Sequence, residues 1–197
     1  MPEDLHSRVA LKLEAVGPSV SIGLEIKIES YFDVVRGLIE DFASKKGMNC
    51  IYVTSSVPSA TLSSALQSLE ANTEGLRFID CVSQTMMGAI HRVDNTVFVE
   101  NPTMLENIIL KVEYFLRLAG DKKTVVVFDS ANSFAIHNDP KMLSEFFTIV
   151  LNSLKAREAY PVVLMIPDQL RAETKELLGM VCDVIMPIEE EHPPSDR

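Results

Sequence analysis

The stretch KKTVVVFDSANSF, residues 122–134, decides the fold class because an uninterrupted apolar run leads directly into an aspartate and a serine. The run VVVF has no polar residue at alternate positions, so both faces of the predicted strand should be buried. Strands that are buried on both faces are typical of parallel sheets covered by helices. Asp129 and Ser130 then stand at the carboxyl end of that strand, where ligands bind in such sheets.

The segments on either side of this strand alternate between strand and helix patterns. Gly47 and Gly120 follow two of the helical patterns, where a helix-ending glycine is expected. The alternation predicts an α/β fold of three layers, with a mostly parallel central sheet between helices. The spacing of apolar residues predicts helices over 31–46, 58–71, 101–120, 139–156 and 168–179, and strands over 19–28, 49–56, 75–83, 95–101, 124–128, 160–167 and 182–188.

The length and composition of the chain fit one domain. Its 197 residues are 47% hydrophobic and 23% charged, which is enough to bury a core without disulfides. We expect the α/β domain to span residues 19–188. An N-terminal segment, residues 1–18, has the pattern of a short amphipathic helix, and residues 189–197 predict a disordered acidic tail.

Charge and cysteine content argue against several classes of function. The net charge of −10 argues against a broad nucleic-acid surface, which needs clustered lysine and arginine. No apolar run approaches the roughly 18 residues of a membrane span, and no secretory signal is evident, so we expect a cytoplasmic protein. The three cysteines and four histidines show no metal-ligand spacing, so we expect buried thiols and no metal site.

The order of the elements resembles the RecA/KaiC-like ATPase domain, a branch of the P-loop nucleotide hydrolases. The resemblance covers roughly residues 20–188 and rests on the series VSIGLEIKI, CIYVTSS, LRFIDCVS, TVVVFDSANSF, VVLMIP and CDVIMPI. It implies a RecA-like fold in which Asp129 corresponds to the carboxylate that holds magnesium beside the nucleotide. It also implies a surface for self-association, because RecA-like domains pack side by side with the nucleotide site at the seam.

The phosphate-binding loop of that family, the Walker A motif, is missing from the sequence. The motif is G-x-x-x-x-G-K-[ST], and none of the eight glycines in this chain is followed by lysine. Counting back from Gly47 by the usual helix length places a degenerate loop at residues 26–33. Ile26 and Tyr31 then stand where glycines would let backbone N–H groups surround the phosphates.

The remaining positions of the degenerate loop are equally unsuited to phosphate. Phe32 takes the place of the lysine, and Asp33 takes the place of the magnesium-binding hydroxyl. Glu29 and Asp33 bring negative charge to a site where a triphosphate would bind. We therefore expect a triphosphate to be repelled there.

A second catalytic part is also missing. KaiC-like domains usually carry acidic residues just after the second strand, whereas Thr54, Ser55 and Ser56 stand there in this chain. A serine hydroxyl is a poor general base without a partner. We therefore assign no catalytic residue, no metal and no cofactor, and the sequence favours a protein that is not an enzyme. Asp129 is then a remnant of a nucleotide site, a structural hydrogen-bond acceptor or part of a different site.

Our first hypothesis is a pseudo-ATPase, a non-catalytic RecA/KaiC-like domain that acts as a scaffold or regulator by binding protein. The partner would be another copy of the chain, giving a homo-oligomer, or an active RecA/KaiC-like relative. The acidic surface would favour a basic partner.

Two alternatives stay open. In the first, an altered loop still binds a nucleotide or another anion through Asp129, Ser130, Thr54 and Ser55, which would make the protein a sensor or an ATPase. In the second, the domain is a DNA-associated scaffold similar to recombinase paralogues. That alternative would gain support if its basic residues gathered on one face, namely Lys12, Lys27, Arg36, Lys45 and Lys46.

Overall fold

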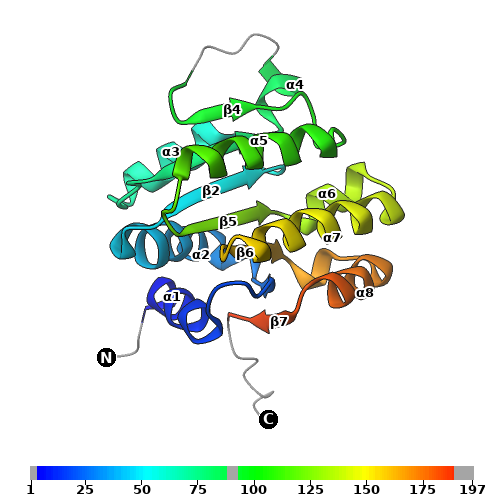
Figure 1. Cartoon of the computed structure of the whole chain (residues 1–197), viewed down its shortest axis with the longest axis horizontal. Helices are drawn as coiled ribbons and strands as arrows, with labels where there is room; N and C mark the ends of the chain where they lie inside the picture. The colour runs from blue at the N-terminus through cyan, green and yellow to red at the C-terminus, as the bar shows by residue number, and fades with distance from the viewer. Residues whose placement is uncertain (1–3, 88–92, 189–197) are drawn as a thin grey trace.

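Seven parallel strands form one sheet in the computed structural model of this chain, which describes residues 4–87 and 93–188 (Figure 1). The strand order is β4-β3-β2-β5-β6-β1-β7. Helices cover both sides of the sheet, so the predicted three-layer α/β class with a parallel sheet is confirmed. The predicted acidic tail, residues 189–197, lies outside the described residues.

The strands and helices follow one another in the alternation expected from the sequence. The strands are β1 (Ile22–Glu25), β2 (Asn49–Thr54), β3 (Leu76–Asp80), β4 (Thr96–Phe98), β5 (Thr124–Asp129), β6 (Tyr160–Met165) and β7 (Val184–Pro187). The α-helices are α1 (Leu5–Val16), α2 (Tyr31–Arg36), α3 (Ser59–Ser68), α4 (Ser83–Met87), α5 (Leu105–Ala119), α6 (Ala131–His137), α7 (Pro140–Ala156) and α8 (Ala172–Val181). Short helical turns η1 (Ile28–Ser30), η2 (Gly37–Ala43), η3 (Ser44–Lys46) and η4 (Pro167–Gln169) complete the set.

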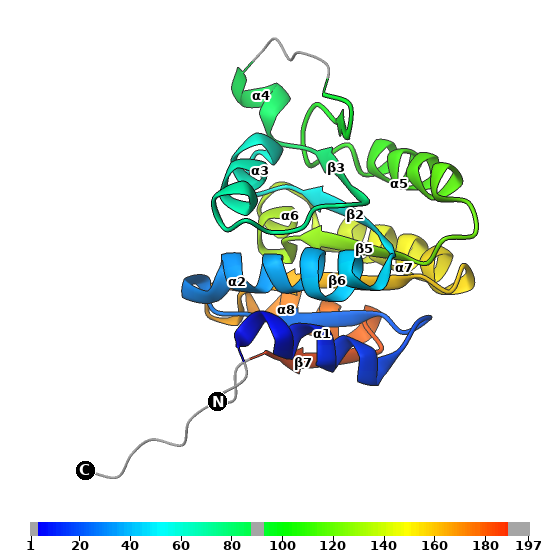
Figure 2. The ribbon, with the colours of Figure 1, turned by 90° about the vertical axis from the view of Figure 1, so that its left-hand side faces the viewer.

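Each face of the sheet has its own apolar core. One core joins α1, α2, η2 and α3 to the sheet, and its side chains include Leu13, Phe42 and Leu66. The other joins α5, α6, α7 and α8 to the opposite face, with Phe128 and Phe147 among its side chains. Figure 2 shows α1, α2 and α3 on one side of the strands and α5 and α7 on the other. Every residue of β5 and of β6 is buried, as expected for strands covered on both faces.

The predicted helix over residues 31–46 is continuous but changes its winding. It begins as α2, widens into the π-helical turn η2, tightens into η3 and ends at Gly47, which has a left-handed φ of 66°. Gly37 begins the widened part and lies against α1. A Cβ atom at Gly37 would come within 2.6 Å of the His6 carbonyl oxygen, so only glycine allows the two helices to approach this closely.

Three local differences from the sequence-based expectation affect the candidate site. The strand predicted over 75–83 ends at Asp80, and a short helix that was not predicted, α4, begins at Ser83. The helix predicted over 101–120 begins at Leu105, because the Asn101 side chain instead accepts a hydrogen bond from the Thr103 backbone N–H and closes a turn. Helix α6 was not predicted at all. Ser130 caps it by accepting a hydrogen bond from the Ser133 N–H at 3.4 Å.

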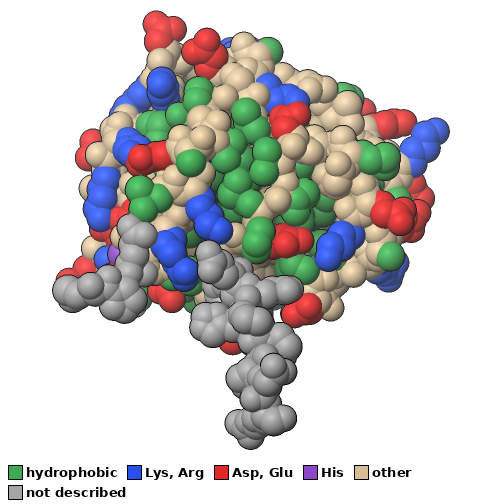
Figure 3. Space-filling view, turned by 90° about the horizontal axis from the view of Figure 1, so that it is seen from below, with side chains coloured by type: hydrophobic (Ala, Val, Ile, Leu, Met, Phe, Trp, Pro, Cys, Tyr) green, Lys and Arg blue, Asp and Glu red, His purple; other side chains and the backbone are tan. Residues whose placement is uncertain are grey.

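The outer edge of β7 is protected against pairing with another strand. Val184 donates its N–H to Ser21, just before β1, and Ile188 donates to Glu25 of β1, so the backbone groups of Ile185 and Pro187 point toward the free edge. Proline has no N–H to offer, and its carbonyl oxygen accepts a hydrogen bond from Lys12 Nζ at 2.6 Å. Figure 3 views this face, where hydrophobic side chains gather at the centre and charged side chains surround them.

Candidate functional site

The carboxyl ends of β2, β3 and β5 lie level with one another. Thr54 at the end of β2 pairs with Asp80 on one side and with Asp129 on the other. The chain segments that follow these strands therefore meet at one edge of the sheet, which is where ligands bind in open parallel sheets.

Asp129 is buried at this edge, and two tyrosines hold its carboxylate. Its side chain is almost inaccessible to solvent, because the whole residue is 1% exposed. The Tyr31 hydroxyl donates a hydrogen bond to Asp129 Oδ2 at 2.5 Å, and the Tyr52 hydroxyl donates to the same oxygen at 3.0 Å. Tyr31 is the first residue of α2, and Tyr52 lies in β2. Asp129 Oδ2 therefore accepts two hydrogen bonds, one for each of its lone pairs.

Burial controls the protonation of this cluster. It raises the pKa of Asp129, although the hydrogen bonds from Tyr31, Tyr52 and Ser56 act in the opposite direction. Burial, together with the negative charge of Asp129, also raises the pKa of both tyrosines. Both phenols therefore stay protonated at neutral pH and remain hydrogen-bond donors.

The segment expected to be the degenerate phosphate loop connects β1 to α2. The Ile26 side chain is buried, and its N–H donates to the Met165 carbonyl oxygen at 2.9 Å. The side chains of Glu29, Phe32 and Asp33 are exposed. No residue from 26 to 33, all of which the structure describes, has the positive φ that glycines give to a phosphate loop.

The three hydroxyl residues after β2 have different surroundings. Thr54 Oγ1 donates to the Val57 carbonyl oxygen at 2.5 Å and so closes the turn that leads to α3. Ser55 donates through both its N–H and its hydroxyl to the Asp129 carbonyl oxygen, at 2.7 Å and 3.0 Å. Ser56 is exposed. The hydroxyls of Thr54 and Ser55 are thus both used in hydrogen bonds to main-chain carbonyl oxygens.

Two adjoining pockets open at this edge of the sheet. The first has a volume of about 440 Å³, and five of the predicted site residues line it, namely Tyr31, Ser55, Ser56, Asp129 and Ser130. Ile26, Glu29, Phe32, Asp33 and Thr54 are not among the described residues that line it. The structure thus brings half of the predicted set together around one cavity.

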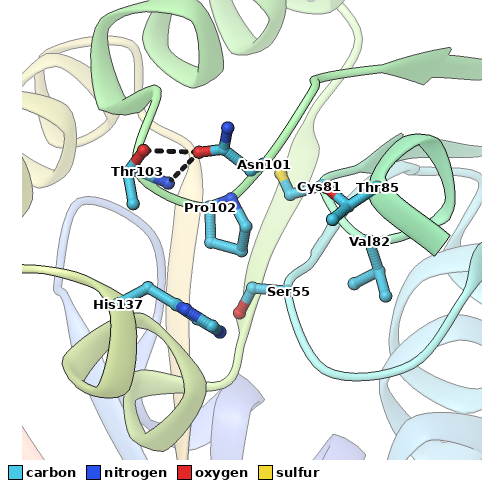
Figure 4. Close-up of a pocket in the computed structure, with 8 residues that line it drawn as sticks. All are labelled: Ser55, Cys81, Val82, Thr85, Asn101, Pro102, Thr103 and His137. Carbon is cyan, nitrogen blue, oxygen red and sulfur yellow. Dashed lines mark hydrogen bonds between the residues drawn. The ribbon is translucent and has the colours of Figure 1, made fainter.

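The second pocket, of about 410 Å³, was not foreseen from the sequence. It shares Ser55, Val82 and His137 with the first pocket. Figure 4 shows the turn at Asn101–Thr103 on one side of it and the side chains of His137 and Ser55 on the opposite side. The residues that sequence reasoning missed are Cys81, Val82, Thr85, Asn101, Pro102, Thr103 and His137. They come from segments without a motif, so only the fold could have assembled them.

Asp80 is a second buried acid at this edge, also unforeseen. Burial alone would raise its pKa, but hydrogen bonds from Ser83 and Ser59 lower it, and the net shift is downward. Its carboxylate accepts from the N–H groups of Ser59, Val82 and Ser83 at 2.8 Å to 2.9 Å, and from the Ser83 hydroxyl at 2.7 Å. Asp80 therefore anchors the first turns of α3 and α4 and is not free to act on a ligand.

Metal ligation finds no support in the side-chain arrangement. Within residues 4–87 and 93–188, no group of three or more His, Cys, Asp or Glu residues could hold a metal ion. The cysteines are free and buried, and burial raises the pKa of Cys50 and of Cys182 to about 12. In the same part of the chain, no helix is both long and apolar enough to cross a bilayer.

Neither a family model nor a curated protein matches the sequence, but solved structures match the fold. A KaiC-like protein from Pyrococcus horikoshii is similar with a TM-score of 0.58 and 13% identity, over 86% of this chain and 72% of that one. The flagellar accessory protein FlaH from Methanocaldococcus jannaschii has a TM-score of 0.51 and 16% identity, over 87% and 71%. The Pyrococcus horikoshii protein PH0250 has a TM-score of 0.62 and 8% identity, over 92% and 88%. The chain therefore has a RecA/KaiC-like fold.

Proposed function

We propose that this chain is a RecA/KaiC-like domain that does not hydrolyse ATP and that acts as a scaffold for protein interactions. The observation that carries the proposal is the hydrogen bond from Tyr31 to Asp129, because it uses the carboxylate that would otherwise hold magnesium. Tyr31 comes from the segment in which the phosphate loop would lie. Tyr31 thus occupies one oxygen of the carboxylate that the phosphate loop would have worked with.

Magnesium binding would require an open carboxylate oxygen with room for water. Mg²⁺ prefers near-octahedral coordination by oxygen and usually keeps several water ligands. Asp129 Oδ2 already accepts two hydrogen bonds, and the residue is buried. An ion at Oδ2 would have to displace both phenols, which makes magnesium binding through that oxygen unfavourable.

Phosphate binding lacks both of its usual sources of positive potential. Of the described residues that line the two pockets, none is a lysine or an arginine. The Ile26 N–H, which follows β1, is used in a hydrogen bond to β6, and the Ser30 N–H donates to the Lys27 carbonyl oxygen at 3.2 Å. An anion would meet Glu29 and Asp33 nearby without the cation or the circle of N–H groups that stabilise phosphates.

The nucleotide-sensor alternative has less support, because it needs hydroxyl groups that are free to bind a ligand. The hydroxyls of Thr54 and Ser55 donate to main-chain carbonyl oxygens, and the Ser130 hydroxyl caps α6. Thr54 and Ser55 therefore do not have these protons available for an anion, whereas Ser130 uses its oxygen as the acceptor in the cap.

The nucleic-acid alternative has less support because three of its five basic residues are paired with acids. Arg36 bonds to Glu40, Lys45 to Asp41, and Lys46 to Glu14. Lys12 donates to a carbonyl oxygen of β7. Local neutralisation leaves little positive potential for phosphates to attract, and the chain as a whole carries a net charge of −10.

A turnover assay tests the enzymatic half of the proposal. Phosphate release from magnesium-ATP is measured for the wild-type chain and for Asp129→Asn, which keeps the shape of the side chain but removes the charge. We expect the same background rate from both proteins. Turnover in the wild type that the substitution abolishes would overturn the proposal. Light scattering on the same wild-type sample gives its mass and thereby distinguishes self-association from a monomer that awaits another partner.

A further inference from the structure

The two pockets form one groove along the strand ends, which we call the strand-end groove. It is defined by the residues that line either pocket, and Ser55, Val82 and His137 line both. One end lies between η1 and α6, and the other lies at the Asn101–Thr103 turn. The groove therefore crosses the ends of β5, β2 and β3, which is a path long enough for an extended ligand.

The lining of the groove is almost without charge. The described lining residues supply aliphatic side chains, hydroxyls, amides and one imidazole. Their one carboxylate belongs to Asp129, which the two tyrosines already occupy. Such a lining suits an uncharged ligand, because a buried charge without a partner is costly.

Large apolar side chains stand exposed at the mouth of the groove. Ile136 of α6 is 74% exposed, and Ile28 of η1 is 52% exposed, and both line the first pocket. Phe32, four residues after Ile28 in the chain, is 41% exposed. Two exposed apolar residues at a cavity, with a third four residues further along the chain, are typical of a surface that is covered by a partner.

Two exposed acidic residues belong to the segment between β1 and the start of α2 that carries Ile28. Glu29 directly follows Ile28, and Asp33 directly follows Phe32, and both carboxylates are exposed. A partner that carries lysine or arginine beside its apolar residues would match this arrangement. A second copy of this chain would match it poorly, because each copy carries a net charge of −10.

We propose that the strand-end groove binds an extended segment of a different protein, with apolar side chains against Ile28 and Ile136 and basic residues beside Glu29 and Asp33. The part of the segment that reaches the Asn101–Thr103 turn is uncharged. This inference rests on the proposed scaffold function, and it names the chemistry of the partner.

Selection from a phage-displayed library of random linear peptides tests the inference. Wild-type protein is the bait, and the enriched peptides are synthesised and titrated against Ile136→Glu and Ile28→Glu. Both positions are exposed, so the substitutions should leave the fold intact, which circular dichroism checks. The matched control is Ile149→Glu on α7, because Ile149 is 58% exposed but does not line the groove.

The expected result is a set of peptides in which apolar residues stand next to lysine or arginine. Their Kd should rise about tenfold or more with either groove substitution and stay unchanged with the control. Binding should also weaken with added salt, and less steeply in a Glu29→Gln, Asp33→Asn variant.

Three outcomes would overturn the inference, namely no enrichment, enrichment of acidic peptides, and binding that both groove variants retain. Each of these leaves the turnover comparison between the wild type and Asp129→Asn untouched. A failure of the groove proposal is therefore distinguishable from a failure of the proposed function.

Discussion

Replacing Tyr31 with phenylalanine removes one hydroxyl from the buried cluster and leaves the ring in place. The lost hydrogen bond spans 2.5 Å and ends on a carboxylate that is 1% exposed, so no water can easily replace the donor. A hydrogen bond to a charged group contributes about 1.5–3 kcal/mol to stability. We therefore expect Tyr31→Phe to lower the free energy of unfolding by about 2 kcal/mol at neutral pH. Tyr52 remains as the second donor and limits the loss.

Urea denaturation followed by circular dichroism measures this loss, and an unchanged m-value shows that both proteins unfold to similar states. The matched control is Tyr114→Phe on α5, because Tyr114 is 47% exposed. Substitutions at such positions usually change stability by less than about 0.5 kcal/mol. If Tyr31→Phe cost no more than this control, the hydrogen bond would not hold the cluster together, and the reasoning would be refuted. A double-mutant cycle with Asp129→Asn assigns the loss to the pair.

The remaining predictions concern pH, helix packing and thiol burial. Burial raises the pKa of Asp129 above its ordinary 3.8, so the folded state binds the carboxyl proton more tightly than the unfolded chain does. Proton binding by Asp129 therefore stabilises the fold fully below pH 3.8, and this contribution is lost as the pH rises through the raised pKa. The free energy of unfolding of the wild type, measured in urea titrations, should therefore fall relative to that of Asp129→Asn, which cannot ionise, as the pH rises from 3.8 through the raised pKa. If the two proteins gave parallel plots of unfolding free energy against pH, the raised pKa of Asp129 would be contradicted. Gly37→Ala should cost about 1–3 kcal/mol, because its Cβ would lie 2.6 Å from the His6 carbonyl oxygen. The control is Gly179→Ala within α8, where a Cβ would have no atom within 4 Å, and it should raise the free energy of unfolding by up to about 1 kcal/mol. If both substitutions changed the melting temperature equally, the close contact between Gly37 and α1 would be contradicted. Burial raises the pKa of Cys50 to about 12, so a thiol reagent should label it only after unfolding, and rapid labelling of the native protein would contradict its burial.

The fold could be predicted because the local sequence of the strands and helices, in apolar runs and helix-ending glycines, indicates each element. The run VVVF before Asp129 could be buried on both faces only in a covered sheet, and Gly47 marked the end of the first long helix. The parallel direction of the strands followed from the alternation of helix and strand, but the strand order, which depends on how distant segments pair, was not predicted. The widened turn η2 could not be predicted, because it depends on how closely α1 approaches Gly37.

The candidate site could be predicted only in part, because its key contact joins distant segments. Tyr31 was placed in the degenerate loop and Asp129 at the strand end, but they are 98 residues apart in sequence. No local pattern indicates that a tyrosine hydroxyl will reach that carboxylate. The pocket beside Asn101 and His137 was missed for a similar reason, since α6 is short and its residues carry no clear helical period.

Calorimetric titration of magnesium-ATP into the purified chain tests the central claim most directly, because it asks whether the site closed by Tyr31 and Asp129 can still accept a nucleotide. The account predicts no saturable heat, even at millimolar nucleotide, and the same baseline for ADP. Saturable binding at micromolar concentration that Asp129→Asn abolishes would contradict it, since the tyrosines would then have to leave the carboxylate to make room for the metal.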